Sequence, residues 1–113
     1  MRKMFGPRKL TVKLKGEVRV KWPDSEGVYN QSPNLLNGKS NWLQESGPNA
    51  LWYDKDNENW KIGQISGLGG FGCRMCSNTG GDLPHRAFPW KYFKNGELTE
   101  SEDIILFCDS SDN

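Results

Sequence analysis

The chain has 113 residues, a formal net charge of +1 and 35% hydrophobic residues, so it is long enough for one domain with a small core. No apolar run approaches the ~20 residues of a membrane span, and three cysteines are too few for a disulfide-rich secreted scaffold. Thirteen glycines and six prolines favour turns over long helices. We therefore predict an all-β fold over residues 1–113, a small antiparallel barrel or sandwich of seven or eight short strands with a long Gly-rich loop.

Charge is divided unevenly between the two ends of the chain. Residues 1–21 hold eight basic side chains against Glu17, whereas the segment from Glu97 onward holds six acids and no base. Such a division indicates either a site for an anionic partner or two ends that neutralise each other. Residues 1–7 begin like a signal peptide, but no apolar stretch follows them, so we expect a soluble chain.

Two alternating runs near the N-terminus predict a basic hairpin over residues 10–22. A three-residue loop at 15–17 would make one face of this hairpin wholly apolar. It would pair Leu14 with Val18, Val12 with Val20, and Leu10 with Trp22. The other face would carry a basic stripe of Lys13, Arg19 and Lys21, which is either a solvated face or a site for phosphates or sulfated sugars.

A second hairpin is predicted at residues 51–63, after short strands at 27–30 and 41–45 that are separated by a tight Asn37-Gly38 turn. Its expected register pairs Tyr53 with Trp60 and Leu51 with Ile62 on one face, and Trp52 with Lys61 on the other. A cation–π contact between Trp52 and Lys61 would then be possible. Because alternation turns Trp52 away from Tyr53, Trp52 is the best candidate for an exposed platform that binds sugar rings or nucleobases.

Residues 63–84 are predicted to form a long Gly-rich loop with one irregular strand near 71–75, and loops of this length are often functional. A strand is expected at 87–93, where Pro89 suggests a sheet edge or a bulge. An Asn95-Gly96 turn follows. Residues 103–108 are the most apolar run and are expected to form a central strand, whereas the tail 109–113 is expected to be frayed.

The cysteines allow three interpretations. Cys73 and Cys76 form a CxxC pair that could complete a Cys₃His zinc site with His85 and Cys108. Alternatively, Cys108 could form a disulfide with Cys73 or Cys76, or all three could be free, partly buried thiols. A redox role has little support, because no βαβ unit surrounds the CxxC pair.

A series of short motifs supports a resemblance over residues 27–108. In order, these motifs are Gly27-Val28-Tyr29-Asn30, Leu36-Asn37-Gly38-Lys39, Asn41-Trp42, Leu51-Trp52-Tyr53, Trp60-Lys61-Ile62-Gly63, Trp90 and Leu106-Phe107-Cys108. This order resembles the poorly characterised short β-rich Trp-x-Ile-Gly modules of large invertebrate and protist multidomain proteins. The resemblance implies a non-catalytic recognition or scaffolding unit.

We therefore predict a non-enzymatic binding module that recognises a protein or a glycan, with no cofactor. The candidate ligand-binding residues are Trp52, Lys61, Phe71 and Arg74. The alternative is a nucleic-acid-binding or zinc-dependent module that uses the basic hairpin and the CxxC loop. Catalysis is not predicted, because His85, the single histidine, has no nucleophile or carboxylate at a recognisable motif spacing.

Overall fold

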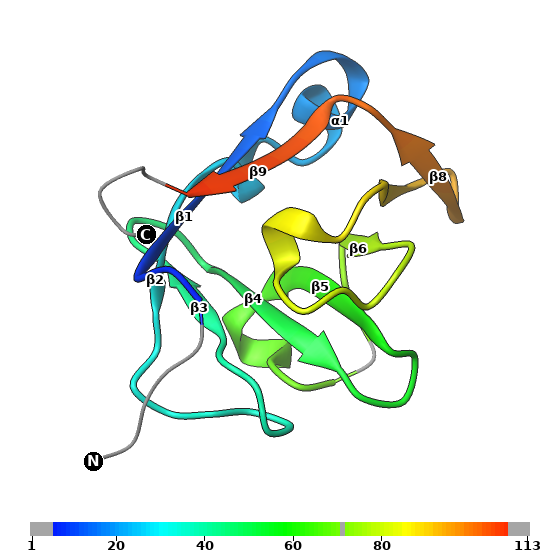
Figure 1. Cartoon of the computed structure of the whole chain (residues 1–113). Helices are drawn as coiled ribbons and strands as arrows, with labels where there is room; N and C mark the ends of the chain where they lie inside the picture. Colours follow the sequence, from blue (N-terminus) through cyan, green and yellow to red (C-terminus); the bar gives the residue numbers. More distant parts are fainter. Residues whose placement is uncertain (1–5, 71, 109–113) are drawn as a thin grey trace.

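The computed structural model describes residues 6–70 and 72–108, which form one antiparallel sheet curled into a nearly closed barrel (Figure 1). The all-β prediction is confirmed. The nine strands of the described residues are β1 (Lys9–Leu14), β2 (Gly27–Gln31), β3 (Trp42–Gln44), β4 (Asn49–Asp54), β5 (Asn59–Gln64), β6 (Met75–Ser77), β7 (Trp90–Lys94), β8 (Glu97–Ser101) and β9 (Ile104–Cys108). The helical segments are α1 (Gly16–Lys21), η1 (Pro23–Ser25), η2 (Ile65–Gly67) and η3 (Pro84–Arg86).

The sheet is a meander with one return connection. Strands β1 to β8 lie side by side in chain order, and β9 then crosses back to pair with β1. The β4–β5 and β7–β8 hairpins use short turns, whereas longer segments join β1 to β2, β2 to β3, β5 to β6 and β6 to β7. The predicted turns at Asn37-Gly38 and Asn95-Gly96 are confirmed: φ is +55° and +77° in the first and +52° and +80° in the second.

Aromatic side chains fill the interior of the barrel. Trp60 belongs to this core and contacts Trp42 and Tyr53 edge to face, at ring-centroid distances of 5.9 Å and 5.2 Å. Such pairs contribute roughly 0.5–1.5 kcal/mol beyond the burial of their area. The predicted register of the β4–β5 hairpin is confirmed, because Tyr53 faces Trp60, Leu51 faces Ile62 and Trp52 faces Lys61.

The predicted N-terminal hairpin is wrong. Residues 16–21 form helix α1, and β1 pairs with β2 on one side and β9 on the other. Both edges of β1 are therefore occupied, which leaves no room for a strand at 18–22. Val18 is 1% exposed and Val20 is 83% exposed, so only one of the two valines belongs to the core. The spacing of Val18 and Trp22 fits a helical turn, and the Trp22 amide donates to the Val18 carbonyl.

The predicted central position of residues 103–108 is also wrong. Strand β9 stands at one end of the sheet order, and its strand partner among the described residues is β1. Ile104 and Leu106 are buried, whereas Phe107 is 45% exposed. Although β9 is apolar throughout, only one of its faces is therefore packed against the core. In the predicted loop at 63–84, a strand does form, but as β6 at residues 75–77.

Candidate functional site

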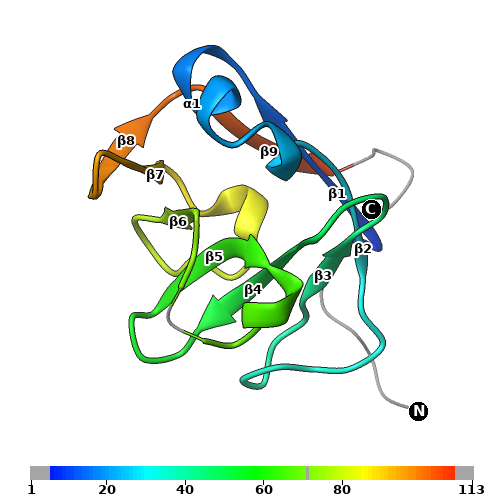
Figure 2. The same cartoon turned by 180° about the vertical axis from the view of Figure 1, so that it is seen from behind.

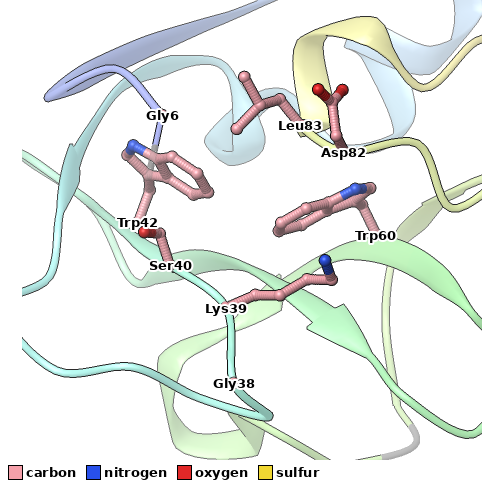
Figure 3. Close-up of a pocket in the computed structure, with 8 residues that line it drawn as sticks. All are labelled: Gly6, Gly38, Lys39, Ser40, Trp42, Trp60, Asp82 and Leu83. Atoms are coloured by element: carbon pink, nitrogen blue, oxygen red, sulfur yellow. The ribbon is translucent and has the colours of Figure 1, made fainter. Parts of the chain in front are cut away.

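A pocket of about 380 Å³ opens at one end of the barrel (Figure 3). Its aromatic walls come from Trp42 on β3 and Trp60 on β5. The turn before β3 and the segment before η3 form the rim. Gly6, which precedes β1 in the chain, completes the wall. The residues that line the pocket are Gly6, Gly38, Lys39, Ser40, Trp42, Trp60, Asp82 and Leu83.

Backbone carbonyls fix the two indoles of the pocket. Trp42 Nε1 donates to the Pro7 carbonyl at 2.8 Å, and Trp60 Nε1 donates to the Gly81 carbonyl at 3.4 Å. Both N–H donors are thus occupied, and the rings offer carbon atoms to the pocket. Trp42 and Trp60 are only 0% and 1% exposed, so the two indoles lie against the pocket with almost no surface open to solvent.

The rim of the pocket is polar and carries both signs of charge. Lys39 Nζ lies 4.9 Å from the centre of the Tyr53 ring, a cation–π contact that holds the ammonium beside the pocket. Asp82 Oδ2 lies 3.5 Å from an Arg86 nitrogen, in an exposed ion pair. The Ser40 hydroxyl accepts a hydrogen bond from Gln31 at 3.2 Å. The rim therefore offers a cation, a carboxylate and a hydroxyl group.

Gly6 is required by the shape of the pocket wall. A Cβ at this position would lie 2.8 Å from Leu83 Cδ2 and 3.0 Å from Trp42 Cζ2. Its φ of +88° also lies in the region that favours glycine. The chain approaches both wall residues this closely only because position 6 lacks a side chain.

Trp52 is not the exposed platform that alternation suggested. It does point away from the barrel interior, but it is 0% exposed. The chain after β5 folds over this outer face, where η2 lies near β4 and β5 (Figure 2). A Cβ on Gly63 would lie 3.0 Å from Trp52 Cη2 and 3.2 Å from the Cys73 backbone. Trp52 is therefore packed beneath the Gly-rich segment rather than presented to a ligand.

The other predicted ligand-binding residues do not form a shared open site with Trp52. Lys61 is 5% exposed, and its Nζ lies 2.6 Å from Asp54 Oδ2. Burial opposes ionisation of Asp54, but hydrogen bonds from Lys61 and Asn57 outweigh it and hold the Asp54 pKa at about 2. Asp54 is thus charged at neutral pH.

Arg74, another predicted ligand-binding residue, makes its contacts with other residues of the barrel. Its guanidinium pairs with Asp24 and lies 4.9 Å from the centre of the Trp22 ring. Phe71, the remaining predicted ligand residue, lies outside the described residues.

The predicted basic stripe is broken by helix α1. Lys13 and Arg19 border one shallow depression, whereas Lys21 borders another. Arg19 pairs with Glu26 at 3.4 Å, and Lys21 Nζ lies 5.6 Å from the centre of the Trp22 ring. The predicted stripe assumed that residues 18–22 form a strand. Because these residues form a helix and its end instead, the three basic side chains do not share one face.

The predicted zinc ligands do not converge either. Within residues 6–70 and 72–108, no three His, Cys, Asp or Glu side chains are placed to hold one metal ion. Within the described residues no disulfide joins Cys73, Cys76 or Cys108, so the predicted disulfide is wrong. Cys108 lies on β9 beside β1 and packs against the core, whereas Cys76 lies on β6 between β5 and β7.

Comparisons of the chain with protein-family models, curated proteins and solved structures gave no match. The resemblance over residues 27–108 therefore stays a prediction. No helix in the described part of the chain is long and apolar enough to cross a membrane.

Sequence reasoning missed the pocket. The Asn37-Gly38 turn was recognised as a turn, but nothing in the sequence brings Lys39 and Ser40 to the same place as Gly6, Asp82 and Leu83. These three segments precede β1, precede β3 and follow β6, and they meet only when the sheet curls into the barrel.

Proposed function

We propose that this protein is a non-enzymatic binding module whose barrel-end pocket binds a sugar residue of a glycan. The observation that carries the proposal is the pocket itself, with two tryptophans in its walls and a mixed polar rim. Its volume of about 380 Å³ falls in the range of roughly 300–1,000 Å³ that is typical of small-ligand sites.

The chemistry of the lining suits a sugar. Sugars have C–H faces that contact aromatic carbon, and hydroxyl groups that both donate and accept hydrogen bonds. Trp42, Trp60 and Leu83 form the apolar part of the lining, Lys39 can donate, and Asp82 can accept. With one cation and one carboxylate at the rim, the pocket favours a neutral ligand over a phosphate or sulfate.

The same lining supports binding rather than hydrolysis. Glycoside hydrolysis commonly uses two carboxyl groups that flank the scissile bond. Asp82 is the single acidic residue among those that line the pocket. The proposed role is therefore recognition without cleavage.

The test is a glycan array with the full chain, followed by titration of any hit with tryptophan fluorescence as the readout. Two glycine variants provide a matched comparison. Gly6→Ala places a Cβ against Leu83 and Trp42, whereas Gly96→Ala places one in open space at a similar φ of +80°. Both changes strain the backbone, but only Gly6→Ala alters the pocket.

We expect Gly6→Ala to weaken binding of the hit by at least about tenfold, since steric changes in a pocket typically cost more than 1 kcal/mol. Gly96→Ala should bind like the unmodified chain. An array with no hit, or equal affinity in both variants, would contradict the proposal.

A further inference from the structure

A second candidate site lies on the outer face of the sheet, away from the barrel-end pocket. Directly opposite residues on neighbouring strands form a row there. Lys61 on β5 faces Cys76 on β6, and Cys76 faces Lys91 on β7. Side chains in such positions share a face of the sheet, with Cβ atoms about 4.5–5.5 Å apart. The Cys76 sulfur is thus flanked on both sides by lysines.

Cys73 brings a second sulfur to this position. A Cβ on Gly63, two residues from Lys61 on β5, would lie 3.2 Å from Cys73 Cα, so Cys73 lies on the same outer face as Cys76. The two thiols are close enough to influence each other's pKa. Cys73 is partly exposed and lines a depression of about 300 Å³ with Gly63, Gly67 and Gly72, whereas Cys76 is only 4% exposed. One thiol can therefore be reached from solvent, and its partner is held behind it.

The surrounding charges favour loss of one proton from the pair. The hydrogen bond from Cys73 lowers the pKa of Cys76, and Lys61 and Lys91 lower it further, while burial and Asp54 oppose the shift. The pKa of Cys73 is raised, first by its hydrogen bond with Cys76 and then by burial. Two thiols coupled in this way lose their protons in two separate steps, so one sulfur carries charge before the other.

We propose that Cys73 and Cys76 are a redox-active dithiol that is oxidised to an intramolecular disulfide by exchange with a low-molecular-weight disulfide. This inference is independent of the proposed glycan site and survives its failure.

The exchange proceeds in two attacks. One proton leaves the pair, chiefly from Cys76, whose pKa is lowered. In the minor form in which Cys73 has passed its own proton to the Cys76 sulfur, the reachable sulfur is the thiolate. This thiolate attacks the small disulfide, so a mixed disulfide forms on Cys73 and one small thiolate departs. Cys76 then loses its proton and attacks Cys73 Sγ, which releases the second small thiolate. In total, the protein loses two S–H hydrogens, and the small disulfide gains the two electrons and becomes two thiols.

The test uses the reduced full chain and oxidised glutathione at pH 7 without denaturant, with acid quenching, intact mass and peptide mapping. We expect a loss of two hydrogens, a Cys73–Cys76 cross-link and no lasting glutathione adduct. Cys108→Ser should behave identically. Oxidation that requires urea, or a stable adduct on the unmodified chain, would overturn the proposal.

Two sets of variants separate the roles of the sulfurs and the charges. Cys76→Ser should trap one glutathione on Cys73, and Cys73→Ser should react about tenfold more slowly because the remaining thiol is buried. Lys91→Met should slow oxidation of the intact pair about threefold and move its pH–rate midpoint upward, whereas the exposed Lys55→Met should change neither. Equal rates for Cys73→Ser and Cys76→Ser, or equal effects of the two lysine variants, would refute the assignment.

Discussion

The buried ion pair of Asp54 and Lys61 gives the sharpest prediction of stability. Their charged atoms are 2.6 Å apart, and both side chains are less than a tenth exposed. Asp54→Asn keeps the oxygen that accepts from the Asp56 and Asn57 amides. It nevertheless places an amide donor against the buried ammonium. We expect a loss of about 3 kcal/mol in the free energy of unfolding, because breaking a buried pair leaves an uncompensated charge.

The lowered pKa of Asp54 gives a second estimate of how much the ion pair stabilises the fold. Its fall from 3.8 to about 2 corresponds to roughly 2–3 kcal/mol of stabilisation of the charged carboxylate. Because the folded pKa lies below the unfolded one, this stability is present above about pH 4. It is lost as the pH falls towards 2. The unfolding free energy of Asp54→Asn should therefore fall less steeply than that of the unmodified chain between pH 4 and pH 2.

Urea unfolding of Asp54→Asn, Lys61→Met and the double variant measures this coupling. The double variant should be more stable than the sum of the single losses predicts, by about 2 kcal/mol. Asp56→Asn, in the exposed part of the same turn, is the matched control and should change stability by less than about 0.5 kcal/mol. A coupling below about 0.5 kcal/mol, or parallel pH profiles, would refute this account of the pair.

Two further pairs of variants test packing outside and inside the barrel. Gly63→Ala should cost about 1–3 kcal/mol because its Cβ meets Trp52 at 3.0 Å, whereas Gly67→Ala, with open space around it, should be nearly neutral in urea unfolding. Val18→Ala should lower the free energy of unfolding by about 2 kcal/mol, and Val20→Ala by less than about 0.5 kcal/mol, since only Val18 is buried. Equal losses at the two valines would instead favour the two-stranded arrangement that the structure replaces with α1.

The β4–β5 hairpin could be predicted because its information is local. Alternation fixes which side chains share a face, and the polar tip at residues 54–59 fixes the register, so Tyr53 and Trp60 had to meet. The Asn-Gly turns were predictable for the same reason, because few residue types adopt positive φ cheaply.

Prediction from local sequence patterns was wrong where the same segment fits both a strand and a helical turn. Residues 18–22 alternate like a strand, but Val18 and Trp22 also share one face of a helical turn. The choice depended on β9, which returns from the other end of the chain to occupy the free edge of β1. No pattern within residues 10–22 contains that information.

By itself, then, the sequence determined the strand-rich class, the turns and the side of the sheet to which Trp52 points. Only the tertiary structure decided that Trp52 is covered and that Gly6, Lys39 and Asp82 border one pocket. The physical reason is the distance along the chain over which each effect acts. Backbone propensity and alternation act between residues that are near in sequence. Burial and pocket shape depend on segments that are far apart in sequence and meet only when the sheet closes into a barrel.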